Sequence, residues 1–235
     1  MKLVVATHNE GKLVEIKRIL QEQLVELSDK FELVTAGSLG LPDPVETGIT
    51  FEQNALLKAR DVAARTGLPA IADDSGIIVD VLGAAPGVLS ARWSGVHGDD
   101  HANNELLLRQ IADISDEFRT ARFRCAAALA IPDTCREVPK GSVMSHTRGF
   151  ETVRMGEMVG RLLHEERGNN GFGYDPLFVP DNQPLRDGVQ MEGLTCAELT
   201  QEEKNAISHR RNALRALLPE LSSIFVDVSE VENII

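Results

Sequence analysis

The sequence is poor in cysteine, and this shortage excludes two ways of stabilising a fold. Its 235 residues include three cysteines, Cys125, Cys135 and Cys196. An odd number of widely spaced cysteines forms neither a disulfide framework nor a set of zinc ligands. We therefore expect a protein of the reducing cytoplasm that needs no covalent or metal staple.

Positive charge is also scarce. Lys and Arg together number 24 against 36 Asp and Glu, so the formal net charge is −12. Nucleic acids and anionic membranes bind mainly to clustered Lys and Arg, and so both are unsuitable partners for this chain. No apolar run approaches the roughly 18 residues that suggest a membrane span, and the apolar run near the start is too short for a secretory leader. We expect no nucleic-acid polymer and no membrane as partner.

The remaining composition is that of an ordinary globular protein, with 43% apolar and 26% charged residues. A chain of this length buries about 70% of the surface of its unfolded state, which is enough for a substantial core. There is no internal repeat, low-complexity tract or flexible linker. The sequence thus predicts a single domain over residues 1–235.

Hydrophobic patterns predict alternating strands and helices. Short apolar runs predict strands at 2–6, 31–35, 70–72, 77–82, 121–131 and about 142–153. The polar turn Asp73–Gly76 separates the third of these from the fourth. Helices are expected from about residue 12, where an apolar stripe begins, from Thr50 to Gly67, after residues 99–100, and from Thr200 to about Leu218. The pairs Thr50/Gln53 and Thr200/Glu203 have the form of capping boxes. The stripe consists of Leu13, Ile16, Ile19, Leu20, Leu24 and Leu27. This order favours an α/β fold with a mixed sheet flanked by helices.

The first candidate site is the polar loop between the first strand and the first helix. A helix N-terminus offers unpaired N–H groups and the positive end of the helix dipole, which together attract anions. Thr7 and Asn9 add short polar groups, and Lys12 adds a positive charge. The loop is not a Walker A motif, since Leu13 stands where that motif needs Ser or Thr. Taken alone, it also fits an ordinary helix cap beside a surface lysine.

The second candidate is a group of carboxylates, Glu46, Asp73 and Asp74. Mg²⁺ prefers carboxylate oxygens combined with phosphate oxygens and water. Neighbouring residues of an extended segment point to opposite sides, so we expect Asp73 and Asp74 to have different roles. The alternative is that the sequence around them is simply a good turn.

Two further segments are candidates for recognising a flat ring. Gly171–Pro176 (GFGYDP) places two aromatic residues among small ones in a chain with only 4% aromatic residues. Lys204–Arg211 (KNAISHRR) is rich in hydrogen-bond donors, and a rotation of about 100° per residue puts Lys204 and Arg211 on one helix face. Each also has a plainer interpretation, as a glycine-rich turn with aromatic residues in the core or as a solvated helix face.

Five strings together resemble the inosine triphosphate pyrophosphatase family, the dITP/XTP pyrophosphatases that remove deaminated purine nucleotides. They are ATHNEGKLVEI, ETGITFEQNALLKA, ADDSGIIVDVLGAAPGVLSARWSG, GFGYDPLF and AELTQEEKNAISHRRNAL. They occur in the order of the family and span about residues 4–218. The segment 180–195 is longer than we expect between the fourth string and the fifth.

The resemblance implies an elongated mixed β-sheet flanked by helices, with two lobes, a central cleft and a homodimer. It implies Mg²⁺-dependent hydrolysis of ITP, dITP and XTP to the monophosphate and pyrophosphate, which removes bases that would be misincorporated into DNA or RNA. Two rivals remain open: a nucleotide-binding sensor without turnover, and a pyrophosphatase acting on other modified nucleotides.

The resemblance also implies roles for residues at matching positions. Glu46 and Asp74 fall where the family binds the metal, and Asp74 is in addition the suggested catalytic base. Thr7, Asn9 and Lys12 fall where the family holds the triphosphate, and His8, Glu10 and Gly11 of the same loop are also expected to bind the substrate, although His8 stands where the family often has Gly. Ser75 falls on a substrate contact. The residues that fall on the base pocket are Phe172, Gly173, Tyr174, Asp175, Lys204, His209 and Arg210. Donors such as Lys204 favour the carbonyl that hypoxanthine and xanthine carry where adenine has an amino group.

Overall fold

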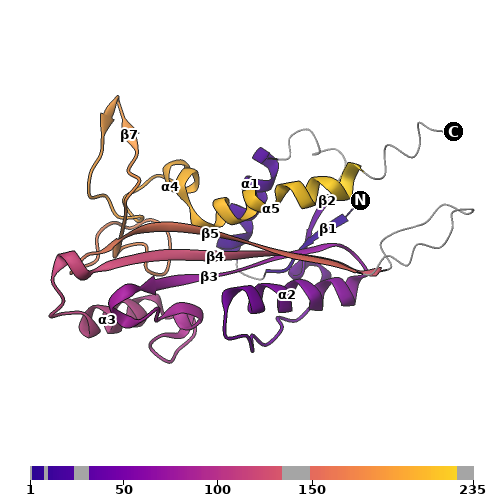
Figure 1. Cartoon of the computed structure of the whole chain (residues 1–235), viewed down its shortest axis with the longest axis horizontal. Helices are drawn as coiled ribbons and strands as arrows, with labels where there is room; N and C mark the ends of the chain where they lie inside the picture. The colour runs from indigo at the N-terminus through magenta and orange to yellow at the C-terminus, as the bar shows by residue number, and fades with distance from the viewer. Residues whose placement is uncertain (1, 8–9, 24–31, 134–148, 227–235) are drawn as a thin grey trace, which may run out of the picture. The chain divides into compact units, whose positions relative to one another are not determined.

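The computed structural model of the chain describes residues 2–7, 10–23, 32–133 and 149–226 (Figure 1). The chain forms two compact units. Unit 1 comprises Met1–Asp74, Ala126–Met155 and Ala213–Ile235, and unit 2 comprises Ser75–Cys125 and Gly156–Asn212. Among the described helices, none combines the length and the apolar character that crossing a membrane requires.

Unit 1 is built on parallel strands joined by helices. Its elements are β1 (Lys2–Val5), α1 (Glu10–Gln23), β2 (Glu32–Thr35), α2 (Phe51–Thr66) and the first part of β3 (Ala70–Val79). The later part of β4 (Thr120–Ile131), the first part of β5 (Phe150–Leu162) and most of α5 (His209–Val226) also belong to it. β1 pairs with β2 in parallel, with Lys2 opposite Glu32, and with β3 in parallel, with Val4 opposite Ala70. The β1 side chains Leu3, Val4 and Val5 are completely buried. β1 is therefore an interior strand, paired on both sides.

The helices of unit 1 follow the predicted patterns closely. Ile16, Ile19 and Leu20 of α1 are buried as the apolar stripe predicts, while Leu24 and Leu27 of that stripe lie outside the described residues. At the start of α2 the Thr50 hydroxyl accepts the N–H of Gln53. The Gln53 side chain accepts the N–H of Ile49 rather than that of Thr50, so this cap is only half of a capping box.

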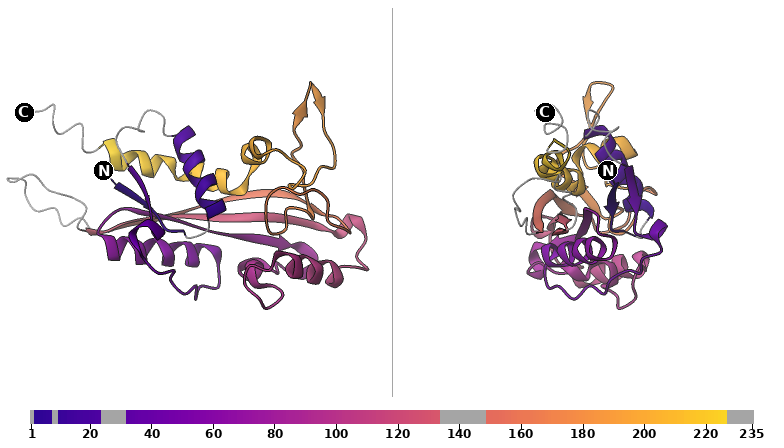
Figure 2. Two further views of the ribbon diagram at one scale, coloured as in Figure 1. Left: turned by 180° about the vertical axis from the view of Figure 1, so that it is seen from behind. Right: turned by 90° about the vertical axis from the view of Figure 1, so that its right-hand side faces the viewer.

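Unit 2 contains the rest of β3 and most of the later elements. These are α3 (Asp100–Gln110), β4 (Thr120–Ile131) up to Cys125, β5 (Phe150–Leu162) from Gly156, β6 (Phe178–Pro180), β7 (Leu185–Arg186), β8 (Val189–Gln190), α4 (Gln201–Ile207) and the start of α5 (His209–Val226). β7 and β8 form an antiparallel hairpin within the long 180–195 segment, and it projects from the rest of this unit in both views (Figures 1 and 2).

Six strands form one sheet in the order β2-β1-β3-β4-β5-β6. The pairs β1–β2 and β1–β3 are parallel, whereas β5–β6 is antiparallel, with Arg161 opposite Val179. The prediction of an α/β fold with a mixed sheet flanked by helices is therefore confirmed.

The prediction of a turn at Asp73–Gly76 is wrong, because β3 runs without interruption from Ala70 to Val79. Asp73 and Asp74 are buried within the strand, and Ser75 is half-buried. Gly76 is needed here for space, since a Cβ atom would lie 2.4 Å from the Ser90 Oγ and 2.6 Å from the Gly87 carbonyl oxygen. The strand ends earlier than expected, since Asp80–Leu82 forms a 3₁₀ turn.

Two other boundaries differ from the predictions. The strand expected at about 142–153 is β5, which begins at Phe150 within the described residues and extends to Leu162. The single helix expected from Thr200 to about Leu218 is two helices, because Ser208 adopts an extended conformation with φ −65° and ψ 142°. The capping box predicted at Thr200 and Glu203 is complete.

The guanidinium of Arg119 is buried in the core of unit 2. Arg119 is 1% exposed, and its guanidinium donates to the backbone carbonyls of Ile111, Leu162 and Leu163 at 2.6–3.1 Å. Burial lowers the pKa of Arg119. These carbonyls come from the end of α3 and the end of β5, so a single side chain links the two elements.

Candidate active site

The strand order of unit 1 creates a natural site for an anion. The chain passes from β1 through α1 to β2 on one side, and then through α2 to β3 on the other side of β1. Right-handed crossovers place such helices on opposite faces of the sheet, and α1 and α2 do lie on opposite faces (Figures 1 and 2). Ligands of open α/β sheets bind where the strand order reverses, at the carboxyl ends of the strands. Here that place lies beside Thr7 and residues 72–74.

Asp73 and Asp74 are consecutive buried carboxylates in β3, 3% and 7% exposed. Each is compensated by a lysine from a different helix. The Lys12 Nζ of α1 lies 3.7 Å from the Asp73 Oδ2, and the Lys58 Nζ of α2 lies 3.3 Å from the Asp74 Oδ1. Because side chains alternate along a strand, the two carboxylates meet the helices on the two faces of the sheet. Their different roles remain a prediction.

Glu46 and Asp74 share one cation. The Lys58 Nζ donates to the Glu46 Oε1 at 2.8 Å and also to Asp74. Asn54 completes the cluster, because its amide nitrogen donates to the Asp74 Oδ2 at 3.2 Å while its oxygen accepts the N–H of Gly48 at 2.8 Å. The loop that carries Glu46 is thereby fixed next to Asp74.

Burial and the neighbouring charges shift the pKa values of Asp74 and Lys58. Burial raises the pKa of Asp74, and the neighbouring Glu46 raises it further, against the opposing effect of Lys58. Burial also opposes the charge of Lys58, but the carboxylates of Asp74, Asp73 and Glu46 outweigh it and raise the pKa of this lysine. A poised carboxylate with a raised pKa beside fixed cations is typical of catalytic sites.

The predicted triphosphate residues are described only in part. Thr7 follows β1, and Glu10, Gly11 and Lys12 form the first turn of α1. His8 and Asn9 lie outside the described residues. Among the described residues, no group of three or more His, Cys, Asp or Glu side chains gathers as metal ligands usually do.

In unit 2, the loop Gly171–Pro176 and helix α4 meet through a buried ion pair. Lys204, 9% exposed, forms a short ion pair with Asp175, which is 3% exposed. The Lys204 Nζ also lies 5.0 Å from the centroid of the Phe172 ring. The same Asp175 carboxylate accepts the N–H of Phe172 at 2.9 Å. Phe172 is 44% exposed, so its ring is accessible although its backbone is fixed by Asp175, and the buried Lys204 ammonium lies next to it.

The other aromatic residue of the loop has a structural role. Tyr174 is 4% exposed and packs in the core of this unit, and its hydroxyl donates to the Ser90 carbonyl at 2.9 Å. Burial raises the pKa of Tyr174 strongly. Tyr174 thus anchors the loop, as the alternative interpretation of the motif expected for its aromatic residues.

Because α4 and α5 are separated at Ser208, the side chains of His209 and Arg210 are buried in the interior of unit 2. His209 and Arg210 begin α5, are 7% and 1% exposed, and are buried as Lys204 is. The His209 ring stacks on Phe123 with centroids 5.0 Å apart, and the Arg210 Nη2 donates to the Ser75 Oγ at 3.2 Å. Continuous-helix geometry paired Lys204 with Arg211, and that pairing fails because the helix ends between them.

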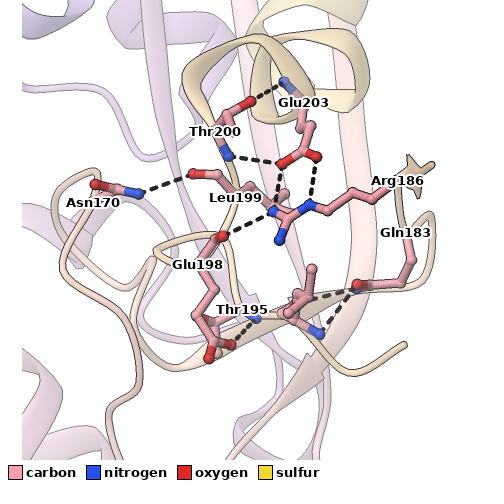
Figure 3. Close-up of polar contacts among 9 residues, drawn as sticks. Asn170, Gln183, Arg186, Thr195, Glu198, Leu199, Thr200 and Glu203 are labelled. Carbon is pink, nitrogen blue, oxygen red and sulfur yellow. Dashed lines mark hydrogen bonds and ion pairs between the residues drawn. The ribbon is translucent and has the colours of Figure 1, made fainter. Parts of the chain in front are cut away.

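Helix α4, which carries Lys204, is braced from the hairpin. Arg186 of β7 donates to both carboxylate oxygens of Glu203 at 2.7–2.8 Å and to the Glu198 carbonyl at 3.1 Å (Figure 3). Glu203 in turn accepts the N–H of Thr200 at 2.8 Å as part of the capping box. The bond from Arg186 and then that from Thr200 lower the pKa of Glu203 to about 2.

Sequence reasoning missed Lys58 and Asn54. Both lie on the buried face of α2, four residues apart, among apolar neighbours. A lysine and an asparagine on a helix face that is otherwise apolar are unusual, because buried polar groups need partners. That signal was available in the sequence, but it does not reveal which carboxylates the lysine meets.

The fold and these clusters define a mixed α/β protein that buries carboxylates and cations together at a strand switch point, a class suited to phosphate-bearing ligands. The chain belongs to the Ham1 family, whose model matches residues 3–220. This membership confirms the resemblance stated from the motifs.

Relatives with names and structures support the same assignment. The chain is 57% identical to a dITP/XTP pyrophosphatase of Bifidobacterium longum subsp. infantis, over 95% of this chain and 99% of that protein. It is 46% identical to a solved dITP/XTP pyrophosphatase of Mycobacterium abscessus, with a TM-score of 0.69 over 93% of this chain and 100% of that one. The Ham1 protein of Staphylococcus aureus is 32% identical, with a TM-score of 0.74 over 95% and 99% of the two chains.

Replacing Lys58 by methionine should destabilise the protein by about 3 kcal/mol, because it leaves two converging carboxylates without their shared cation. Urea denaturation without added metal measures the free energy of unfolding. Lys58→Arg should restore part of the loss, and Lys17→Met on α1 provides the same chemical change outside the cluster. A loss no larger than that of Lys17→Met would contradict the role of Lys58.

Replacing Glu203 by glutamine should lower stability in a pH-dependent way. The pKa of Glu203 falls from 4.5 to about 2 on folding, so its carboxylate stabilises the protein fully above about pH 4.5 and loses this effect as the pH falls toward 2. The difference in urea midpoint between wild type and Glu203→Gln should therefore narrow from about pH 6 to about pH 3. Glu202→Gln, one residue away, should show a smaller difference that does not follow this course.

Proposed function

We propose that this protein hydrolyses the deaminated purine nucleoside triphosphates ITP, dITP and XTP to the monophosphate and pyrophosphate, with Mg²⁺ as cofactor. The observation that carries the proposal is the buried Asp74, held next to Glu46 and Lys58 at the strand switch point of a Ham1-family chain. The proposal includes a homodimer that acts in the cytoplasm on the nucleotide pool. The homodimer rests on the resemblance, and the cytoplasm on the odd number of widely spaced cysteines.

The residues present suit a divalent metal. Mg²⁺ at nucleotide sites is commonly bound through one or two carboxylates, with phosphate oxygens and water completing its shell. Glu46 and Asp74 are two such carboxylates, and both already reach one common cation, the Lys58 ammonium. These two residues would hold the metal. When bound, it would neutralise phosphate charge and favour the departure of pyrophosphate.

The other groups of unit 1 account for the remaining chemistry. Lys12, whose side chain is 20% exposed, is a cation beside the N-terminus of α1, where phosphate oxygens are favoured. Burial raises the pKa of Asp74, so its carboxylate is a better proton acceptor than an exposed one. Asp74 is thus suited to take a proton from the water that attacks the α-phosphorus. Asn54 and Lys58 hold its two oxygens in place.

The clusters of unit 2 suit the nucleoside. The Phe172 ring offers an open face for stacking, and Lys204, His209 and Arg210 are donors for the carbonyl at position 6 of the purine. Adenine presents an amino group there, which would face another donor.

A substrate panel with separate detection of pyrophosphate and orthophosphate tests the proposal. We expect pyrophosphate from ITP, dITP and XTP in the presence of Mg²⁺, no turnover after chelation, and little turnover of ATP or GTP. Orthophosphate as first product would refute the reaction class, and equal rates on GTP would refute the specificity. Faster turnover of a pyrimidine or methylated nucleotide would support the rival enzyme, and tight binding without turnover would support a sensor.

Replacing Asp74 by asparagine should lower turnover of dITP by about 10²–10⁴-fold, because the amide cannot accept the proton of the attacking water. The measurement is kcat under saturating dITP, with the fold checked by circular dichroism. Asp61→Asn on the same unit, where Asp61 pairs with Arg65 on α2, is the matched control. An unchanged rate in Asp74→Asn would remove this residue from the role of base.

A further inference from the structure

Helix α3 grips the backbone of the aromatic loop at a single residue. The N–H of Gly173 donates to the Asp100 Oδ2 at 2.7 Å, and the carbonyl of Gly173 accepts from the Asn104 Nδ2 at 3.0 Å. Asp100 and Asn104 are four residues apart and therefore lie one above the other on the same helix face. Both backbone polar groups of one glycine are thus held by one helix. We call this pair of contacts the α3 clamp.

The orientation of the Asn104 amide is determined by its neighbours. Its Nδ2 donates to the Glu166 Oε1 at 2.6 Å as well as to Gly173. The flipped amide would place its oxygen against two acceptors, so only the orientation described satisfies the network. Asn104 is 2% exposed, and its Oδ1 is buried without a hydrogen-bond partner among the described residues. An unpaired buried acceptor costs stability, so this asparagine is explained by what its Nδ2 holds.

Gly173, the residue held by the α3 clamp, lies in the chain between Phe172 and Asp175, two residues that we assign to binding of the base. Gly173 has φ +62°, a conformation that favours glycine, and open space surrounds the position that a Cβ would take. On one side of it is the half-exposed Phe172 ring, and two residues further on is Asp175, which pairs with Lys204. A rotation of the Gly173 peptide would therefore move both the ring and the partner of the buried ammonium.

We propose that Asp100 and Asn104 are positioning residues that set the specificity of the enzyme for the purine base. They hold the N–H and the carbonyl of Gly173. Through this residue they fix the orientation of the Phe172 ring and of the Asp175–Lys204 pair. The proposal deepens the proposed function and rests on it, since it assigns the loop to base recognition. Neither residue belongs to a segment that the sequence analysis singled out for chemistry.

Kinetics of Asn104→Ala and of the milder Asp100→Asn test this role. For Asn104→Ala we expect a KM for dITP about tenfold higher, the size of effect typical of one lost hydrogen bond, with kcat within about threefold of wild type. The ratio of kcat/KM for ITP to that for ATP should fall by about tenfold. Hydrogen exchange of the amides of residues 171–175 should become about tenfold faster. Asp100→Asn should change the same quantities in the same direction.

Asn103→Ala is the matched control. Asn103 is the neighbouring residue of α3, is also 2% exposed, and accepts the N–H of Ser94 at 2.7 Å. It should lower the melting temperature comparably while leaving KM, base discrimination and exchange of the loop unchanged. Equal kinetic effects of Asn103→Ala and Asn104→Ala would overturn the positioning role, as would faster exchange of the loop without a change in KM. Wild-type protein inactive on dITP would instead refute the proposed function, while the exchange data would still report whether the α3 clamp holds the loop.

Discussion

Two consecutive buried carboxylates in β3 are the constraint on which unit 1 depends. A carboxylate removed from water must be paired or must lose its charge. Because Asp73 and Asp74 point to opposite faces of the sheet, one cation cannot serve both. Lys12 reaches Asp73 from α1, and Lys58 reaches Asp74 from α2. Compensation of both charges therefore requires a helix on each face of the sheet. The doubly wound order of the strands provides this, because it places α1 and α2 on opposite faces.

The parts of the fold that sequence reasoning predicted well are those set by neighbours along the chain. The apolar stripe of α1, the cap of α2 at Thr50 and the capping box of α4 at Thr200 each involve residues within four positions of one another. Their energies are local, and the same side chains satisfy the same backbone groups wherever the helix is placed. The mixed α/β class followed from the order of these elements, and the family followed from five motifs taken together.

The predictions that failed depended on partners far away in the chain. A short polar string between apolar runs favours a turn in water, but residues 73–76 remain in a strand because Lys12, Lys58, Asn54 and Ser90 surround them. The break between α4 and α5 at Ser208 was likewise not predicted from the sequence. Because of it, His209 and Arg210 are buried, whereas a continuous helix would have placed Arg211 on the face of Lys204. The position of Lys58 on an apolar helix face hinted at a buried partner, but its partners Glu46 and Asp74 lie twelve and sixteen positions away and could not be identified from the sequence.

Motifs identify the side chains that would touch a ligand, whereas the groups that hold those side chains are spread over other elements. Asp74 is held by α2, Lys204 stands on a helix braced by Arg186 of the hairpin, and Gly173 is held by α3. Each of these supports uses a charged or amide group, whose hydrogen bonds are stronger and more directional than apolar contacts. A donor set can reject a wrong base only if it cannot move to accommodate it, since a mobile donor would turn aside at little cost. The proposed base specificity therefore depends on the supporting residues as well as on the donors themselves.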